Sequence, residues 1–186
     1  MAWTITSKDL GLPPITSLST ATGSLTQGAT TVYPASAKPR IPGGLLGKIV
    51  SASNPELGNG EFIFLKGVSS TVLGSIVRYD DGFQTALAGT AVDVGEPNAV
   101  AMAACTGSYY GWYQIAGLAV AKKASATTFA DGAPLAAASG LAIAAVTNVQ
   151  MINAVVRTVT TSSGAAANYV AIAINRPGGP GNGVAA

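Results

Sequence analysis

The residues that could take part in catalysis are eight carboxylates and one cysteine, because the 186-residue chain has no histidine. The carboxylates are Asp9, Glu56, Glu61, Asp80, Asp81, Asp93, Glu96 and Asp131. Most lie beside a glycine, a proline or another acid, which is typical of turns. Asp80 and Asp81 precede Gly82, and their spacing lacks the alternating oxygen ligands of a dedicated calcium loop. We therefore expect a turn at this position.

The absence of histidine removes the commonest general base, the commonest metal ligand and every nucleophile that histidine would activate. The single cysteine, Cys105, lies in an apolar context without a basic neighbour in sequence, so we expect a small buried side chain rather than a reactive thiol. No glycine-rich phosphate-binding motif is present. The sequence predicts no catalytic residue, no metal site and no cofactor, and we expect that the protein is not an enzyme.

Charge is sparse over the whole sequence. Only 10% of the residues are charged, whereas about 25% is usual in soluble domains. The ten lysines and arginines are scattered, which argues against nucleic-acid binding. The most apolar window, residues 133–146, is interrupted by Pro134 and Gly140 and is shorter than the roughly 20 residues that span a bilayer. We expect no membrane partner and synthesis in the cytoplasm. A weakly charged surface favours a component of an assembly, with an ordinary low-charge secreted domain as the alternative.

Residues 107–123 form the most informative stretch. Trp112, Gln114, Ala116, Leu118 and Val120 alternate with residues that are also mostly apolar, which predicts a buried, central strand. Gly111 and Gly117 indicate a bend, a bulge or a close approach of another backbone. Trp112 is expected in the core rather than on a base- or sugar-stacking platform, whereas Tyr109 and Tyr110 could lie at an interface.

The sequence divides into an N-terminal arm of residues 1–45, a β domain of residues 46–175 and a flexible tail of residues 176–186. Eight or nine short strands separated by turn residues predict an all-β fold, an antiparallel β-sandwich or barrel with an extended N-terminal arm. Residues 135–146 also suit a helix, but the β surroundings and Gly140 favour strands. The candidate stretches for these strands are residues 47–52, 61–66, 72–79, 91–94, 99–104, 110–120, 141–146, 149–152, 154–160 and 168–174.

The arm is rich in proline and glycine and holds its apolar residues singly. Disorder is one interpretation. We favour an extended segment whose apolar side chains fill separate pockets on a partner, since the arm has too few charges for the usual signature of disorder. The residues predicted to contact that partner are Trp3, Ile5, Leu10, Leu12, Ile15, Leu18, Val32 and Tyr33.

Several runs between residues 46 and 123 resemble one protein family. They are Gly-Lys-Ile-Val-Ser-Ala from residue 47, Gly-Glu-Phe-Ile-Phe-Leu-Lys-Gly-Val-Ser-Ser-Thr from residue 60, Gly-Ser-Ile-Val-Arg-Tyr-Asp from residue 74, Val-Ala-Met-Ala from residue 100 and Tyr-Gly-Trp-Tyr-Gln-Ile-Ala-Gly-Leu-Ala-Val from residue 110. They are similar to small proteins of tailed bacteriophages that are described as capsid decoration or cement proteins. These runs are scaffold motifs, so no site residue is transferred.

The resemblance implies a β module, a homo-oligomer, that binds the outside of the major capsid protein shell and bridges capsomers. The location implied is the capsid surface of the virion. If the arm makes the contacts, deletion of residues 1–40 is expected to leave a folded domain that no longer binds capsids. A tail-associated or glycan-binding, receptor-binding protein is the alternative, and a hydrolase of cell-wall sugars, which needs two carboxylates across a cleft, is the third.

Overall fold

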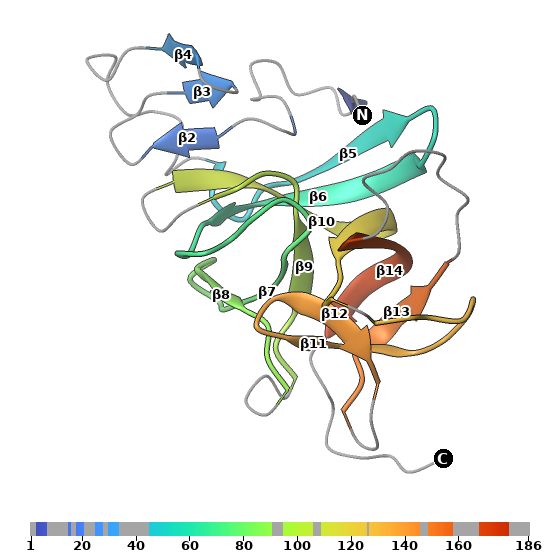
Figure 1. Cartoon of the computed structure of the whole chain (residues 1–186). Coiled ribbons are helices and arrows are strands. Elements are labelled where there is room, and N and C mark those ends of the chain that lie inside the picture. The colour runs from blue at the N-terminus through green and yellow to red at the C-terminus, as the bar shows by residue number, and fades with distance from the viewer. Residues whose placement is uncertain are drawn as a thin grey trace.

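Every element of the described structure is a β-strand, and twelve strands join in one antiparallel sheet (Figure 1). The computed structural model describes residues 3–6, 15, 18–20, 25–27, 30–33, 45–90, 95–105, 109–125, 127–145, 149–157 and 168–178. The strands are β1 (Thr4–Ile5), β2 (Leu18–Thr20), β3 (Leu25–Gln27), β4 (Thr30–Tyr33), β5 (Ile49–Asn54), β6 (Gly58–Lys66), β7 (Ile76–Tyr79), β8 (Thr85–Leu87), β9 (Asn98–Ala101), β10 (Tyr109–Lys122), β11 (Leu135–Ala138), β12 (Leu141–Ala144), β13 (Ile152–Val156) and β14 (Tyr169–Gly178). The predicted all-β antiparallel class is confirmed.

Strand β10 is the centre of the sheet, as predicted, because it pairs with four other strands. It lies beside β6 along its first half and beside β14 along its second half, and it also pairs with β2 and β9. Its length of 14 residues, the largest of any described strand, lets it belong to two rolled sheets at once.

The first roll consists of β6, β10, β9, β7 and β8 in that order. It closes where the Lys66 amide donates to the Phe83 carbonyl at 3.0 Å and the Thr85 hydroxyl donates to the Lys66 carbonyl at 2.7 Å. Its interior holds apolar side chains from around the ring, which we call the Tyr113 cluster: Ile63, Leu65, Val77, Ala99, Ala101, Cys105, Tyr113 and Ile115. This part of the chain therefore forms the barrel alternative of the predicted fold.

The second roll uses the other half of β10 with β14, β13 and the hairpin β11–β12. The Met151 amide donates to the Leu135 carbonyl at 2.8 Å, and the Ala124 amide donates to the Ala142 carbonyl at 3.0 Å, so the hairpin joins β13 to the end of β10. The apolar residues enclosed here, including Leu135, Val156 and Ile172, are named the β14 cluster.

The hairpin resolves the ambiguity over residues 135–146 in favour of strands. Ser139 and Gly140 connect β11 to β12, and both have positive φ, 50° and 75°. Two consecutive positive φ values are characteristic of the type I′ turn, which matches the twist of the strands it connects. Glycine supplies one of them without steric cost.

A third apolar cluster lies against β5, β6 and β10 and is covered by residues of the arm. It consists of Ile15, Val50, Ala52, Phe62, Phe64 and Trp112, with Trp3 and Ile5 packed against it, and we call it the arm-covered cluster. β1 adds to the edge of β5, with Thr4 opposite Ser53.

The simple two-residue alternation predicted across β10 is wrong beyond Gln114. Gln114 lies opposite Phe62 but Ala116 lies opposite Glu61, so one extra residue is inserted into β10. Adjacent residues of β6 point to opposite faces, so the bulge shifts the faces of β10 by one residue. Gly117 is part of this irregularity, with a φ of 99°, as its type had suggested.

Other predicted boundaries also change. The strands predicted at residues 149–152 and 154–160 are replaced, among the described residues, by the single strand β13 at Ile152–Val156. β14 extends to Gly178, so residues 176–178, predicted to begin the tail, are part of a strand. β7 starts at residue 76 instead of 72, and residues 70 and 74 adopt positive φ before it. The predicted strand at residues 91–94 lies outside the described residues.

Candidate functional site

Three of the predicted partner contacts are packed against the molecule's own sheet. The rings of Trp3 and Phe62 lie 4.8 Å apart, edge to face, and Ile5 is half-buried beside them. Ile15 is only 1% exposed. The apolar character of these residues is therefore used inside the chain, and in this conformation Ile15 has no surface left to offer a partner.

The remaining predicted contacts belong to the arm farther along. Leu18, Val32 and Tyr33 are in strands β2 and β4, and β2 pairs with β10 at Tyr109–Gly111. Their backbone is described, whereas Leu10 and Leu12 lie outside the described residues. β4 pairs only with β3 among the described strands, so it ends the sheet on that side.

The aromatic residues of β10 do not form an exposed platform. Trp112 and Tyr113 are 1% and 0% exposed, which confirms the core prediction for Trp112. Tyr110 is half-buried and stacks on Phe64 with the ring centroids 6.4 Å apart. A sugar- or base-stacking role for the whole group is not compatible with this burial.

The Tyr113 hydroxyl is the main polar atom inside the first roll. It lies near the Cys105 thiol and the hydroxyls of Thr71 and Thr85, but no contact among the described residues meets hydrogen-bond geometry for it. Burial raises the pKa of Tyr113 and of Cys105, and the neighbouring Thr85 and Thr71 hydroxyls oppose this only weakly for Tyr113. Both groups are therefore protonated at neutral pH, as expected for an unreactive, buried Cys105.

Four of the described carboxylates make structural contacts. The Asp80 carboxylate accepts a hydrogen bond from the Gln84 amide at 2.9 Å, which makes the predicted turn. Glu61, Glu96 and Asp131 pair with arginines at 3.0, 2.6 and 3.9 Å respectively. Among the described residues, no group of three or more potential metal ligands lies together, and no helix is long and apolar enough to cross a membrane. Asp9 and Asp93 lie outside them.

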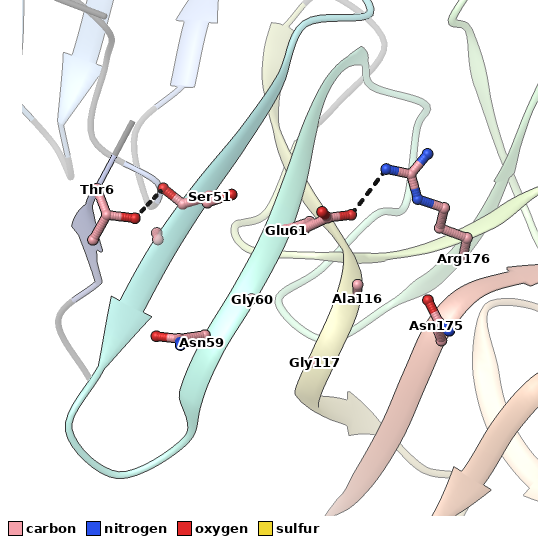
Figure 2. Close-up of a pocket in the computed structure, with 10 residues that line it drawn as sticks. Thr6, Ser51, Asn59, Gly60, Glu61, Ala116, Gly117, Asn175 and Arg176 are labelled. Atoms are coloured by element: carbon pink, nitrogen blue, oxygen red, sulfur yellow. Dashed lines mark hydrogen bonds and ion pairs between the residues drawn. The ribbon is translucent and has the colours of Figure 1, made fainter. Parts of the chain in front are cut away.

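A polar groove of about 660 Å³ crosses the junction of β5, β6, β10 and β14 (Figure 2). Figure 2 shows Glu61 and Arg176 facing each other across it, and Asn59 and Asn175 also line it. The backbones approach closely here, since a Cβ added at Gly117 would lie 2.3 Å from the Asn59 carbonyl oxygen. Arg176 has a φ of 48°, unusual for a non-glycine residue and a source of local strain.

A second hollow is apolar and has a volume of about 620 Å³. Its walls include Trp3, Leu57, Met102, Val120 and Tyr169, and none of the described residues that line it is charged. Leu73, at its rim, is 50% exposed, and the adjacent Val72 is 36% exposed. Sequence analysis did not find this pocket, because its walls come from β10, β14 and loops that only the fold brings together.

Comparison of the chain with protein-family models, with curated proteins and with solved structures gave no match in any of the three.

Proposed function

We propose that the protein is a structural component of a phage virion, a capsid decoration or cement protein that bridges capsomers on the outside of the shell. Its partners are the major capsid protein and further copies of itself, and it acts without catalysis. Binding alone is enough for this role, provided that contact area is large: stable interfaces bury on the order of 1,600 Å² in total.

The observation that supports this proposal best is the apolar surface around Leu73, whose adjoining pocket is lined by no charged residue in the described part of the chain. Depletion of charge with exposed apolar and aromatic groups is the compositional mark of the centre of an interface. Here an apolar pocket, an exposed leucine and an exposed valine occur together on a chain with few charges. Such a surface suits permanent coverage by another protein.

The free side of β4 offers a second kind of contact. A strand that ends a sheet has unpaired N–H and C=O groups and can accept a strand from another chain. Among the described strands β4 pairs only with β3. Repeated weak contacts of this kind over a capsid lattice would reinforce one another.

The direct test is electron microscopy of virions made with and without this protein. We expect density for one β domain on the outer capsid surface that disappears when the protein is absent, together with earlier capsid rupture on heating. Density on the tail instead, with an unchanged capsid surface, would contradict the proposal.

Deletion of residues 1–40 would not test capsid binding alone. It would also remove Trp3 and Ile15, which pack with Phe62 and Trp112 in the arm-covered cluster, and so could affect folding. A sharper variant changes Leu18, Val32 and Tyr33 to serine and leaves residues 3–15 intact. We expect a folded protein with reduced capsid binding in a co-sedimentation assay. The matched control changes Thr20, Thr30 and Thr31, in the same two strands, to serine. Equal capsid binding by both variants would show that the arm is not part of the capsid interface.

A second candidate is glycan binding, which the polar groove favours. Amide, carboxylate and guanidinium groups of Asn59, Asn175, Glu61 and Arg176 are suited to hydrogen-bond sugar hydroxyls. A glycan-array signal that Asn59→Ala and Asn175→Ala abolish would favour this candidate. If the wild-type protein gives no signal on the glycan array, the glycan-binding candidate is excluded and the cement proposal is the one that remains.

A further inference from the structure

Gln114 is a buried polar side chain with one half of its amide unused. It is 1% exposed. Its Nε2 donates to the carbonyls of Ala116 and Leu118, both at 3.1 Å, so both donors are occupied and the orientation of the amide is fixed. No donor among the described residues bonds to its Oε1. An acceptor without a donor, on a side chain with so little exposed surface, usually marks a place where a water or a ligand binds.

Gln114 lines the apolar pocket described above, with Trp3, Met102 and Val120 among the other walls. Binding sites for organic groups are typically cavities of about 300–1,000 Å³, mostly apolar, with a few polar groups that fix orientation. The pocket, at about 620 Å³, falls within this range, and Gln114 supplies the one fixed amide. The apolar pocket walls and the Gln114 amide therefore belong to one candidate binding site.

We infer that this pocket is a binding site for an uncharged aromatic group with one hydrogen-bond donor, which packs against the apolar walls and donates to Gln114 Oε1. A charged group is disfavoured because the described residues that line the pocket carry no opposite charge and burial of an unpaired charge is expensive. An indole combines a large apolar ring with a single N–H donor and so meets both requirements.

In the proposed capsid role, the group is a tryptophan side chain of the partner polypeptide. The continuity of the pocket with the arm-covered cluster supports this source, since Trp3, from an extended strand of the chain itself, forms part of the pocket wall and packs on Phe62. The same face thus already holds one aromatic side chain from an extended segment. This choice of source rests on the proposed function, whereas recognition of the ring does not.

The test is titration of the full-length protein with indole, followed by NMR of ¹³C-methyl methionine. Met102 lines the pocket and Met151 is buried in the β14 cluster, so the protein contains both a reporter and an internal control. We expect a saturable shift of Met102 alone, with a Kd of about 1–10 mM for a ligand of this size. N-acetyl-tryptophanamide should give the same shift if the pocket accepts a ring attached to a peptide.

The donor is tested with 1-benzothiophene, which has nearly the shape of indole but no N–H. We expect binding about five-fold weaker, the effect of one lost hydrogen bond. Equal affinity of the two rings would overturn the role of Gln114. Failure of indole to shift Met102, or equal shifts of Met102 and Met151, would overturn the site, without bearing on the virion experiment.

Two variants separate a specific pocket from general stickiness. Ala103 lies in the pocket wall and is half-buried, so Ala103→Trp should fill the cavity and abolish the indole shift. Ala144 is exposed at the end of β12 and does not line the pocket, so Ala144→Trp should leave binding unchanged. Loss of binding in both variants, or in neither, would contradict the proposed site.

Discussion

The two rolled sheets and the arm-covered cluster bury apolar side chains in different ways. The Tyr113 and β14 clusters are enclosed by strands that pair with one another around a ring. The arm-covered cluster lies on the sheet formed by β5, β6 and β10 and is closed by Trp3, Ile5 and Ile15 of the N-terminal arm, of which Ile5 lies in the edge strand β1. The domain thus completes two of its clusters itself and leaves the third to an added segment.

The difference indicates where a partner can act. A ring of paired strands encloses its own apolar interior, whereas the cluster covered by a short added segment continues into an apolar pocket at its border. The surface beside this cluster combines the exposed side chain of Leu73 with room for more contacts. We therefore expect substitutions in the rings to affect folding, and substitutions around the arm-covered cluster to affect folding less.

The largest effect should come from the interior of a ring. Ile172, in β14, is 0% exposed and lies opposite Ala119 of β10 and Val156 of β13. Ile172→Ala should lower the free energy of unfolding by about 2–5 kcal/mol, through lost burial and the cavity that remains. Urea denaturation followed by circular dichroism measures this. The matched control is Ile152→Ala in β13, where the side chain is 44% exposed, and a change within about 0.5 kcal/mol is expected.

The point where the two rings meet should be almost as sensitive. Gly117 has a φ of 99°, and an added Cβ would overlap the Asn59 carbonyl oxygen. Gly117→Ala should cost about 2–3 kcal/mol, because both the backbone conformation and the strand spacing are affected. Gly58 has a φ of 75° but open space around its Cβ position, so Gly58→Ala reports the conformational part alone, about 1 kcal/mol. Equal losses for the two would show that the close approach does not matter.

A smaller effect is expected from the segment that covers the third cluster. Trp3→Ala removes a half-buried ring from Phe62 and should cost about 1–2 kcal/mol, less than full burial of a large side chain is worth. Because the chain has two tryptophans, this variant leaves Trp112 as the only tryptophan, whose emission can be excited selectively. Acrylamide should then quench Trp112 more strongly than it does in Trp3→Phe, where a ring remains. Identical quenching would mean that Trp3 does not shield the cluster.

Sequence patterns predicted the elements better than they predicted the connections between them. The period-two pattern around Trp112 and the turn residues at Asp80 identify local structure, because both depend on near neighbours. The bulge after Gln114 is set by pairing with Glu61, far away in sequence. The two-residue alternation contains no sign of this bulge, so it assigned the β10 residues beyond Gln114 to the wrong faces of the sheet. The side chain of Arg176 pairs with Glu61 across 115 residues, and no local signal marks the end of β14.

The candidate sites were less predictable than the fold. The sequence of a proline-rich arm does not distinguish an apolar residue that fills a pocket on a partner from one that fills a pocket on its own chain. For Ile15, the chain itself provides the pocket. Likewise the use of both amide donors of Gln114 depends on where the bulge places two carbonyls. These features arise from tertiary contacts, which single-sequence patterns do not contain.

The smallest effect at neutral pH should come from the polar atom enclosed in the first ring. Tyr113→Phe should change stability by less than about 1 kcal/mol at about pH 7, since the hydroxyl makes no hydrogen bond with good geometry to the described residues.

At alkaline pH the difference in stability between Tyr113→Phe and the wild type should change. Burial raises the pKa of the Tyr113 hydroxyl above its ordinary value of 10.0, so the unfolded chain releases this proton before the folded protein does. The stability associated with this group is complete below about pH 10 and decreases above it, toward the folded-state pKa. Urea denaturation at about pH 7 and about pH 10.5 should therefore show a smaller loss for Tyr113→Phe than for the wild type. The same loss in both proteins would mean that the Tyr113 hydroxyl is as accessible to titration in the ring as it is in the unfolded chain.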